Sequence, residues 1–200
     1  MDAVRAGRKT LSFPEGSIIT PLARDAARQH GISLETGPVE LGHTAPLPSS
    51  SRIVCIGSDH GGFDVKKVIV TFLSGKDWTV VDVGTDSAKA CDYPDFAYAV
   101  ARMVSDGRAG TGIMIDGTGI ASSIVCNKVP GIHAACAYNE FTAWSARAHN
   151  NANILTLGSR SLGVEVCKRI VTTFLETAYE GGRHELRIAK IRDIEIKFGR

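Results

Sequence analysis

From residue 52 onward, short apolar, β-branched runs alternate with longer segments whose apolar residues recur at helical spacing. The runs that predict strands cover residues 52–57, 78–83, 111–115, 132–137 and 153–157. Helical patterns cover residues 62–74, 95–106, 121–127, 139–149, 163–178 and the basic tail from about residue 183. Because the strands are apolar almost throughout, both faces of their sheet must be covered. The order of elements predicts a five-stranded parallel sheet between two layers of helices.

The chain before residue 52 has a different composition. Residues 37–51 read GPVELGHTAPLPSSS, which is typical of a linker. Before it, Thr20 and Pro21 predict the start of a short amphipathic helix, because a hydroxyl residue caps a helix and proline fits its first position. We therefore expect an N-terminal extension over residues 1–36, a linker over 37–51 and the main domain over 52–200.

Charge and cysteine content exclude several classes of partner. The net charge is +2 at pH 7, so no bulk field directs the chain toward nucleic acid or a membrane surface. No apolar run is long enough to span a bilayer, and the first residues lack the apolar core of a secretory signal. The five cysteines show neither CxxC pairs nor metal-ligand spacing. We expect a cytoplasmic protein with no metal, no disulfide framework and no membrane contact.

Ligands of parallel α/β sheets bind beyond the carboxyl ends of the strands, so the loops at 57–62, 84–94, 116–121 and 158–163 are candidates for a site. The first loop carries Asp59 and His60, followed by two glycines at the start of a helix. Free N–H groups there suit an anion. Asp59 suits a sugar hydroxyl, and His60 suits a phosphate oxygen. The alternative is an ordinary tight turn in which the aspartate caps the helix.

The loop after the third predicted strand, from Asp116 to Ala121, also combines a carboxylate with flexible backbone. Its N–H groups could stabilise the oxygen of an enediolate. The alternative is a generic glycine turn. The loop is not a full GxGxxG motif, and no acidic ribose-binding residue follows at the required distance, which argues against a dinucleotide site.

Two further segments carry clusters of polar side chains. Arg147, His149 and Asn150 come at the end of a predicted helix, where histidine and asparagine are also common as structural residues. Arg183 and Arg187 are four residues apart and share one face of the predicted tail helix, which suits a phosphate. The alternative for the tail is a solvated basic helix.

Five separated motifs together resemble one family. They read SDHGG, DYPD, GTGIA followed by NKVPGI, ARAHNNANIL, and EGGRHELR. They occur in the order found in ribose-5-phosphate isomerase B and the related galactose-6-phosphate isomerase subunits, over roughly residues 52–195. The resemblance implies a Rossmann-like α/β/α domain that isomerises a phosphorylated sugar through a cis-enediolate without a cofactor. It also implies a homodimer or dimer of dimers with the site between two subunits.

The resemblance implies roles for the residues at matching positions. Asp59 matches the residue that contacts the ring oxygen and hydroxyls of the sugar. Thr118 lies in the loop that matches the enediolate-binding segment, and His149 matches the histidine that opens the furanose ring. Eight further residues match substrate-binding positions: His60, Tyr93, Gly117, Gly119, Arg147, Asn150, Arg183 and Arg187. Among them, Arg147 matches an assisting position.

The chain departs from the family pattern at the catalytic base. Directly before GTG, where the common type has cysteine, this chain has Asp116. A second type places a glutamate base a few positions later, where this chain has Ala121, Ser122 and Ser123. A carboxylate in a buried site can abstract an α-proton, so we expect Asp116 to replace the cysteine. Cys126 falls too far along the following helix to substitute.

Three functions stay open at this point. The first is an active isomerase, with ribose 5-phosphate to ribulose 5-phosphate as the leading reaction. The second is a sugar-phosphate-binding subunit of a hetero-oligomer with little activity of its own. The third is an isomerase or epimerase for another sugar phosphate of four to six carbons.

The N-terminal extension carries a second, shorter resemblance. The segment PEGSIITPLARDAARQHGI, within residues 13–35, is similar to sequences on enzymes associated with bacterial microcompartments. This implies contact with a shell or cargo and a location inside such a compartment. The alternative is a helix that packs on its own domain.

Overall fold

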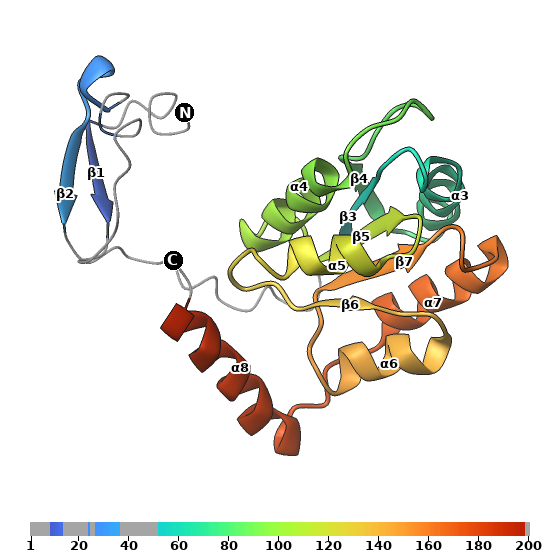
Figure 1. Ribbon diagram of the computed structural model, residues 1–200. Helices are drawn as coiled ribbons and strands as arrows, with labels where there is room; N and C mark the ends of the chain where they lie inside the picture. Colours follow the sequence, from blue (N-terminus) through green and yellow to red (C-terminus); the bar gives the residue numbers. More distant parts are fainter. Residues whose placement is uncertain (1–8, 14–23, 25–26, 37–51, 199–200) are drawn as a thin grey trace. The chain divides into compact units, whose positions relative to one another are not determined.

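The structure, a computed structural model, describes residues 9–13, 24, 27–36 and 52–198 (Figure 1). The chain divides into two compact units, residues 1–45 with Arg200 and residues 46–199. The predicted linker over residues 37–51 and the predicted helix start at Thr20 and Pro21 lie outside the described residues. The domain limits proposed from the sequence stay predictions.

The larger unit contains the predicted five-stranded sheet, with strand order β4-β3-β5-β7-β6 and parallel pairing throughout (Figure 1). Its strands are β3 (Ile53–Ser58), β4 (Thr79–Asp82), β5 (Thr111–Asp116), β6 (Ala134–Cys136) and β7 (Ile154–Gly158). The three central strands are buried over almost their whole length, whereas the edge strands β4 and β6 are partly exposed. This burial explains why the central strands read as continuous apolar runs.

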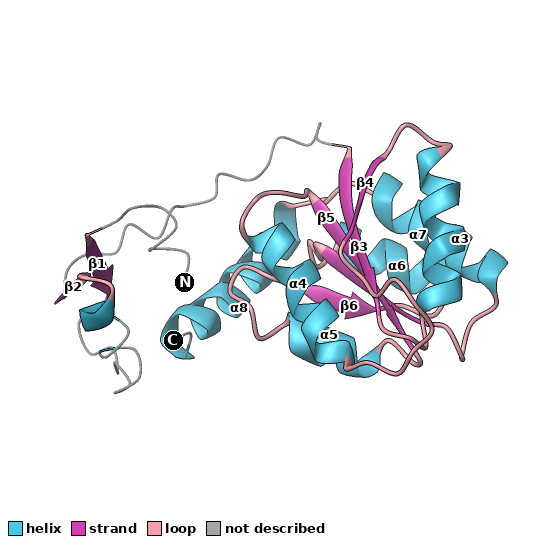
Figure 2. Ribbon diagram, turned by 90° about the horizontal axis from the view of Figure 1, so that it is seen from above, coloured by secondary structure: helices cyan, strands magenta, loops and turns pink. Residues whose placement is uncertain are grey.

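Helices cover both faces of the sheet, as Figure 2 shows. They are α3 (Phe63–Ser74), α4 (Tyr93–Ser105), α5 (Ile120–Cys126), α6 (Glu140–Ala148) and α7 (Val164–Glu176). Helices α4 and α5 pack on one face, and α3, α6 and α7 on the other. Successive residues of β5 enter opposite cores, because strand side chains alternate: Ile113 and Ile115 face α3 and α7, and Met114 faces α4. The three-layer α/β/α prediction is confirmed.

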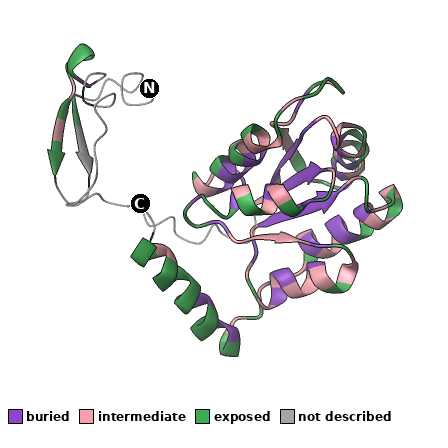
Figure 3. Cartoon of the chain, viewed as in Figure 1, coloured by how far each residue is buried: buried purple, intermediate pink, exposed green. Residues whose placement is uncertain are grey.

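The chain ends in a helix that covers little of the domain. A 3₁₀ turn, η1 (Gly182–His184), leads into α8 (Glu185–Phe198), in which Ile188 is buried and most other residues are exposed (Figure 3). Near the far end of α8, the Glu195 carboxylate accepts a hydrogen bond of 2.7 Å from the backbone N–H of Gly131. Over the described residues, no helix combines the length and apolar character needed to cross a membrane.

The N-terminal extension contains strands that the sequence analysis missed. Strand β1 (Thr10–Phe13) pairs in parallel with β2 (Ser33–Thr36), and Arg24 and residues 27–29 between them are helical. Parallel strands need a crossover connection, and the helical residues lie within it. The expectation of a helical extension was therefore incomplete. The two strands are short and mix polar with apolar residues, which left no strand periodicity to detect.

Candidate active site

Two strand-end loops are held in close approach at the carboxyl edge of the sheet, the edge where β3, β5 and β7 end. A Cβ atom on Gly62 would lie 2.1 Å from the carbonyl oxygen of Ile115, so only glycine lets the first loop reach β5. Ser159 lies in the loop after β7 and makes two hydrogen bonds. Its hydroxyl donates to the Gly61 carbonyl at 2.7 Å, and its backbone N–H donates to the Asp116 carbonyl at 2.8 Å. Ser159 thus ties together the loops that carry Asp59 and Asp116.

Asp59 and His60 lie side by side in the first loop. Asp59 is 7% exposed, and its carboxylate accepts a hydrogen bond of 3.0 Å from the N–H of Gly62. His60 Nδ1 lies 3.3 Å from the backbone nitrogen of Cys91 and 3.2 Å from its carbonyl oxygen. Nδ1 can therefore accept from the N–H when the ring is neutral or donate to the carbonyl when it is charged. In both states Nε2 remains available as a donor to a ligand.

Asp116 lies at the end of β5 and is 4% exposed. Its Oδ1 accepts hydrogen bonds from the backbone N–H of Thr118, at 2.7 Å, and of Gly119. Its Oδ2 accepts from both the backbone N–H, at 3.2 Å, and the hydroxyl of Ser122. The side chain therefore folds back on its own loop, with both oxygens bonded.

The loop conformation depends on Gly119. This residue has φ of +79°, in the left-handed region, and a Cβ atom there would lie 2.9 Å from Cys136 Sγ and from the backbone of Leu157. The resulting turn directs the N–H groups of Thr118 and Gly119 to the same point, which Asp116 Oδ1 occupies. Two converging N–H donors are the arrangement that stabilises a developing oxyanion.

Arg160 is a residue of this edge that the sequence analysis did not select, although its loop was a candidate. Its backbone N–H donates to the Gly117 carbonyl at 3.0 Å, and its side-chain Cδ lies 3.6 Å from the position that a Gly117 Cβ would take. Arg160 is exposed, so its guanidinium can meet an anion at this edge. The signal available in the sequence was its position three residues after a predicted strand.

A second group of predicted residues gathers around His149, the C-cap of α6. The His149 ring stacks on the ring of His184, with centroids 4.3 Å apart and planes 10° apart, and meets Trp144 edge-on at 4.7 Å. Glu180 Oε2 lies 3.7 Å from His149 Nε2 and 3.9 Å from His184 Nε2. His184 and Glu180 were absent from the predicted site, because the stacking depends on tertiary packing between the α6 end and η1.

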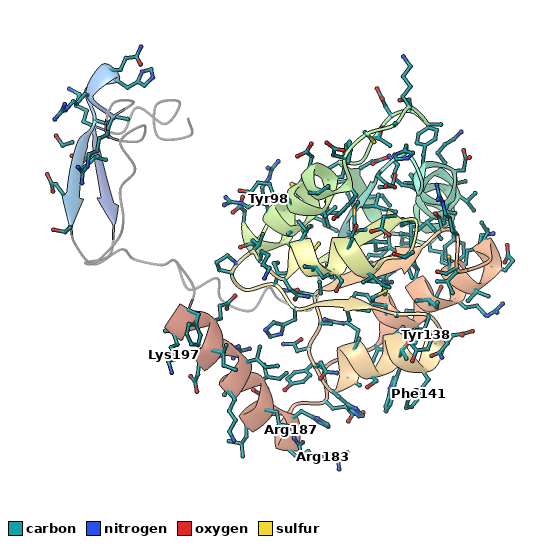
Figure 4. The ribbon with its side chains drawn as sticks, in the orientation of Figure 1. Tyr98, Tyr138, Phe141, Arg183, Arg187 and Lys197 are labelled. Carbon is teal, nitrogen blue, oxygen red and sulfur yellow. The ribbon has the colours of Figure 1, made fainter. Side chains whose placement is uncertain are left out.

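The two predicted phosphate-clamping arginines extend from this group. Arg183 Nε donates to His184 Nε2 at 3.3 Å, and an Arg187 N–H donates to the Arg183 carbonyl at 3.4 Å. Figure 4 shows both side chains together at the start of α8. The positive charges of His149, Arg183 and Arg187 lower the pKa of His184, although burial is the larger cause.

His149, Glu180 and His184 also offer three potential metal ligands, whose atoms lie within 4.8 Å of one another. The arrangement does not suit a metal ion. The two rings stack face to face, so their in-plane lone pairs run nearly parallel instead of converging. His184 Nε2 in addition already accepts from Arg183. The cluster fits a stacked pair of histidines with one carboxylate beside it.

Three predicted residues have mainly structural contacts. The Arg147 guanidinium donates to the Ala152 carbonyl and lies over the Phe174 ring, and burial lowers its pKa. These contacts hold Arg147 against its own subunit, and its assistance in phosphate binding stays a prediction. Asn150 Nδ2 donates to the Ser145 carbonyl at 3.0 Å. Tyr93 begins α4 and packs on the core between α4 and the sheet.

The two groups of residues lie at opposite edges of the sheet. Asp116 ends β5, whereas His149 comes five residues before β7 begins. Strands β5 and β7 pair in parallel, with Gly112 opposite Ile154 and Asp116 opposite Gly158. At 3.3 Å per residue, four residues of strand separate the two edges by about 13 Å. Within one copy of the chain, His149 and the arginines therefore stand at the amino edge, away from Asp59 and Asp116.

Cys126 and Cys136, the two cysteines that follow Asp116 most closely in the chain, are poor candidates for a base. Burial raises the pKa of Cys126 to about 12, so this thiol stays protonated near neutral pH. This agrees with the sequence analysis, which excluded Cys126 as a substitute for the base. Cys136 Sγ donates to the Thr118 carbonyl at 3.6 Å, and burial raises its pKa as well.

Comparisons with known proteins identify the family of the chain. The model of the ribose/galactose isomerase family matches residues 54–191. The chain is 42% identical over 142 residues to ribose-5-phosphate isomerase B of Escherichia coli, covering 71% of this chain and 95% of the relative. It is 39% identical over 139 residues to the D-erythrulose-4-phosphate isomerase of Pectobacterium atrosepticum, covering 69% and 91%.

The solved structure of ribose-5-phosphate isomerase B from Clostridium thermocellum superposes with a TM-score of 0.73 at 46% identity, covering 74% of this chain and 99% of that one. In a parallel α/β/α domain, ligands bind at the loops beyond the carboxyl ends of the strands. The chain belongs to the ribose/galactose isomerase family and is an isomerase.

Proposed function

We propose that the chain interconverts the aldose and ketose forms of a phosphorylated sugar, with ribose 5-phosphate and ribulose 5-phosphate as the leading pair. The observation that carries the proposal is the convergence of a carboxylate and two N–H donors at the end of β5, Asp116 with Thr118 and Gly119. A base beside an oxyanion site is what enediolate chemistry requires. The names of the relatives support a sugar phosphate of four or five carbons as substrate.

The complete site is formed by two copies of the chain. Asp59, His60 and Asp116 at the carboxyl edge of one copy meet His149, Arg183 and Arg187 at the amino edge of a second copy. The separation of these groups by the length of the strands supports this arrangement. A C₂ dimer built in this way contains two equivalent sites.

Helix α8 supplies an apolar surface for that contact. Ile191, Ile194 and Phe198 are spaced three and four residues apart, so they share one face of the helix, and they are 46%, 60% and 68% exposed. Arg187 lies one turn before Ile191 on the same face. A second copy that covers this stripe would receive Arg187 at its own carboxyl edge.

The reaction begins with ring opening. His149 of the second copy exchanges a proton with the ring oxygen and the anomeric hydroxyl, and Glu180 stabilises the charged form of its ring. Asp59 accepts a hydrogen bond from a sugar hydroxyl and fixes the open chain. The phosphate can accept hydrogen bonds from both copies: from Arg183 and Arg187 of the second copy, and from Arg160 and His60 Nε2 of the first.

Proton transfer then converts the aldose to the ketose. Asp116 takes the proton from C2, the C–H electron pair forms the C1–C2 double bond, and the carbonyl pair moves onto O1. The N–H groups of Thr118 and Gly119 stabilise the resulting enediolate. Asp116 returns its proton to C1, the O2 proton passes to O1, and the C2 carbonyl forms. Neither step uses a metal or a cofactor.

A second candidate function is a sugar-phosphate-binding subunit with little activity. The hydrogen bonding of Asp116 favours it, because both carboxylate oxygens are occupied within the chain. The test is an assay of the purified chain against phosphorylated aldoses and ketoses of four to six carbons, with product identification in D₂O. Turnover that incorporates solvent deuterium at the carbon that receives the proton supports isomerisation. Binding without turnover supports the second candidate, and an inverted centre without carbonyl migration indicates an epimerase.

For the N-terminal unit we propose a docking role toward a microcompartment shell or cargo, carried by residues 13–35, in a cytoplasmic protein. Its division from the larger unit supports this proposal. A chain that lacks residues 1–45 should keep its isomerase kinetics and lose co-sedimentation with shells. Loss of the kinetics, with co-sedimentation retained, would contradict the docking role.

A further inference from the structure

The Asp116 carboxylate has two differently bonded oxygens. Oδ1 accepts from the N–H groups of Thr118 and Gly119, which belong to the glycine-containing turn. Oδ2 accepts from the N–H and hydroxyl of Ser122, which is fully buried in the first turn of α5. One oxygen is therefore held by the turn and the other by a single serine.

The bonds to Oδ1 conflict with the proposed reaction. The enediolate needs the same two N–H groups that Oδ1 occupies, and Asp116 needs a free lone pair to accept the proton from carbon. Oδ1 and a substrate oxygen cannot both receive these N–H bonds in full. A substrate oxygen must therefore replace Oδ1 before the chemistry starts.

We infer that Asp116 Oδ1 fills the enediolate-binding N–H groups in the free enzyme and that Ser122 is a positioning residue that holds Oδ2 while Oδ1 is exchanged for a substrate oxygen. The inference rests on the proposed function. Loss of two donors makes the carboxylate a stronger base, so the base becomes active only after a sugar with an oxygen at this point has bound. The two bonds from Ser122 keep the side chain from swinging away from the substrate carbon.

The neighbouring serine offers a matched control. The Ser123 hydroxyl donates to the Ala134 carbonyl of β6 at 3.2 Å, and the residue is partly buried. Ser122 and Ser123 therefore differ in their contact with Asp116 but share residue type and helix.

The first experiment measures the affinity of a phosphorylated four-carbon hydroxamate, whose planar group mimics an enediolate, by calorimetry. Asp116→Ala leaves the N–H groups of Thr118 and Gly119 unoccupied. If a substrate oxygen normally has to replace Oδ1 there, this variant should bind the hydroxamate about tenfold more tightly than wild type. If Asp116 only anchors the loop, the same variant binds it more weakly, which would overturn the inference.

In the wild-type protein, which needs no substitution, the amide resonances of Thr118 and Gly119 should shift on binding more than that of Ser122. Equal shifts at all three would also count against exchange.

The second experiment compares pH profiles of kcat. Ser122→Ala removes a donor that favours the ionised carboxylate, so the acid limb should move upward by about one pH unit, whereas Ser123→Ala should leave it in place. Equal profiles for wild type and Ser122→Ala contradict the positioning role.

If wild type neither binds the hydroxamate nor isomerises any sugar phosphate, both the proposed function and the inference that rests on it are wrong. If wild type does both and the variants give the contrary signs, the inference fails alone.

Discussion

The rings of His149 and His184 stack with their centroids 4.3 Å apart, and Glu180 lies within 4 Å of a nitrogen of each. Two positive rings in this arrangement would repel each other, and one carboxylate cannot compensate both fully. The pair therefore favours a single positive charge, in line with the lowered pKa of His184. His184 is therefore the ring of the pair whose charged form is disfavoured.

The lowered pKa of His184 makes the stability of the larger unit depend on pH. Because the folded state holds His184 neutral, the unfolded chain binds the extra proton first as the pH falls. The free energy of unfolding should therefore decrease as the pH is lowered from about 6.5, the ordinary histidine value. His184→Gln should weaken this dependence, and urea titrations between pH 5 and pH 8, roughly the histidine range, measure it. His30→Gln, an exposed histidine of the other unit, is the control. A dependence that His184→Gln leaves unaltered would refute the assignment.

Asp116→Asn should abolish turnover and retain ligand binding. An amide cannot accept the carbon-bound proton, so kcat should fall by about 10³-fold, within the usual range for loss of a general base. Affinity for the substrate phosphate should change less than about threefold, since the arginines are untouched. Asp106→Asn, an exposed carboxylate paired with Arg102, is the control. Wild-type turnover in Asp116→Asn would remove this residue from the mechanism.

Arg187→Ala should raise KM for the sugar phosphate by about tenfold or more, because a charge-assisted hydrogen bond to the phosphate is lost. The effect should be smaller at high salt, where screening already weakens the wild-type contact. Lys190→Ala removes an exposed positive charge from the same helix and should leave KM unchanged. Equal effects of the two substitutions would indicate a general field instead of a clamp.

The buried ammonium of Lys66 predicts an asymmetric pair of variants. Lys66 Nζ is bonded to both carboxylate oxygens of Asp82, at 2.8 and 2.7 Å, and to the Thr85 carbonyl at 2.7 Å. Asp82→Ala leaves a buried charge with one partner. Because the Asp82 side chain is 41% exposed, the loss should lower the free energy of unfolding by about 2 kcal/mol, less than for a fully buried pair. Lys66→Met, which removes the charge itself, should cost less. Asp86→Ala, in the following exposed loop, serves as the control, and thermal unfolding decides the order.

The sequence predicted the larger unit well, for a physical reason. Runs such as Ile53–Ser58 and Thr111–Asp116 are buried on both faces, so they are apolar almost throughout. Such a run identifies a strand from local sequence, without information about its neighbours in the sheet. The strands β1 and β2 of the extension carry no such signal, since Thr10–Phe13 and Ser33–Thr36 are short and partly polar. Their pairing depends on contacts across the chain that local pattern does not encode.

The site was predictable at the level of loops but not of side-chain contacts. Asp59 and Asp116 follow predicted strands, which places them at the carboxyl edge. His149 precedes a predicted strand, so chain order alone already assigns it to the other edge. The fold-back of Asp116 onto Ser122 and the stacking of His184 on His149 depend on rotamers and tertiary packing, and no sequence spacing reports them.

The most direct test of the two-copy site mixes two inactive variants. Asp116→Asn lacks the base at the carboxyl edge, and the double variant Arg183→Ala with Arg187→Ala lacks the clamp at the amino edge. Asp116→Asn should be inactive alone, and the double variant nearly so at substrate concentrations below the wild-type KM. When co-expressed they form mixed dimers in which one of the two sites is intact. With random assembly, half of the dimers are mixed, so about a quarter of wild-type activity should return. Mixed dimers, verified by differently tagged copies, that remain as inactive as the parent variants would contradict a site shared between two copies.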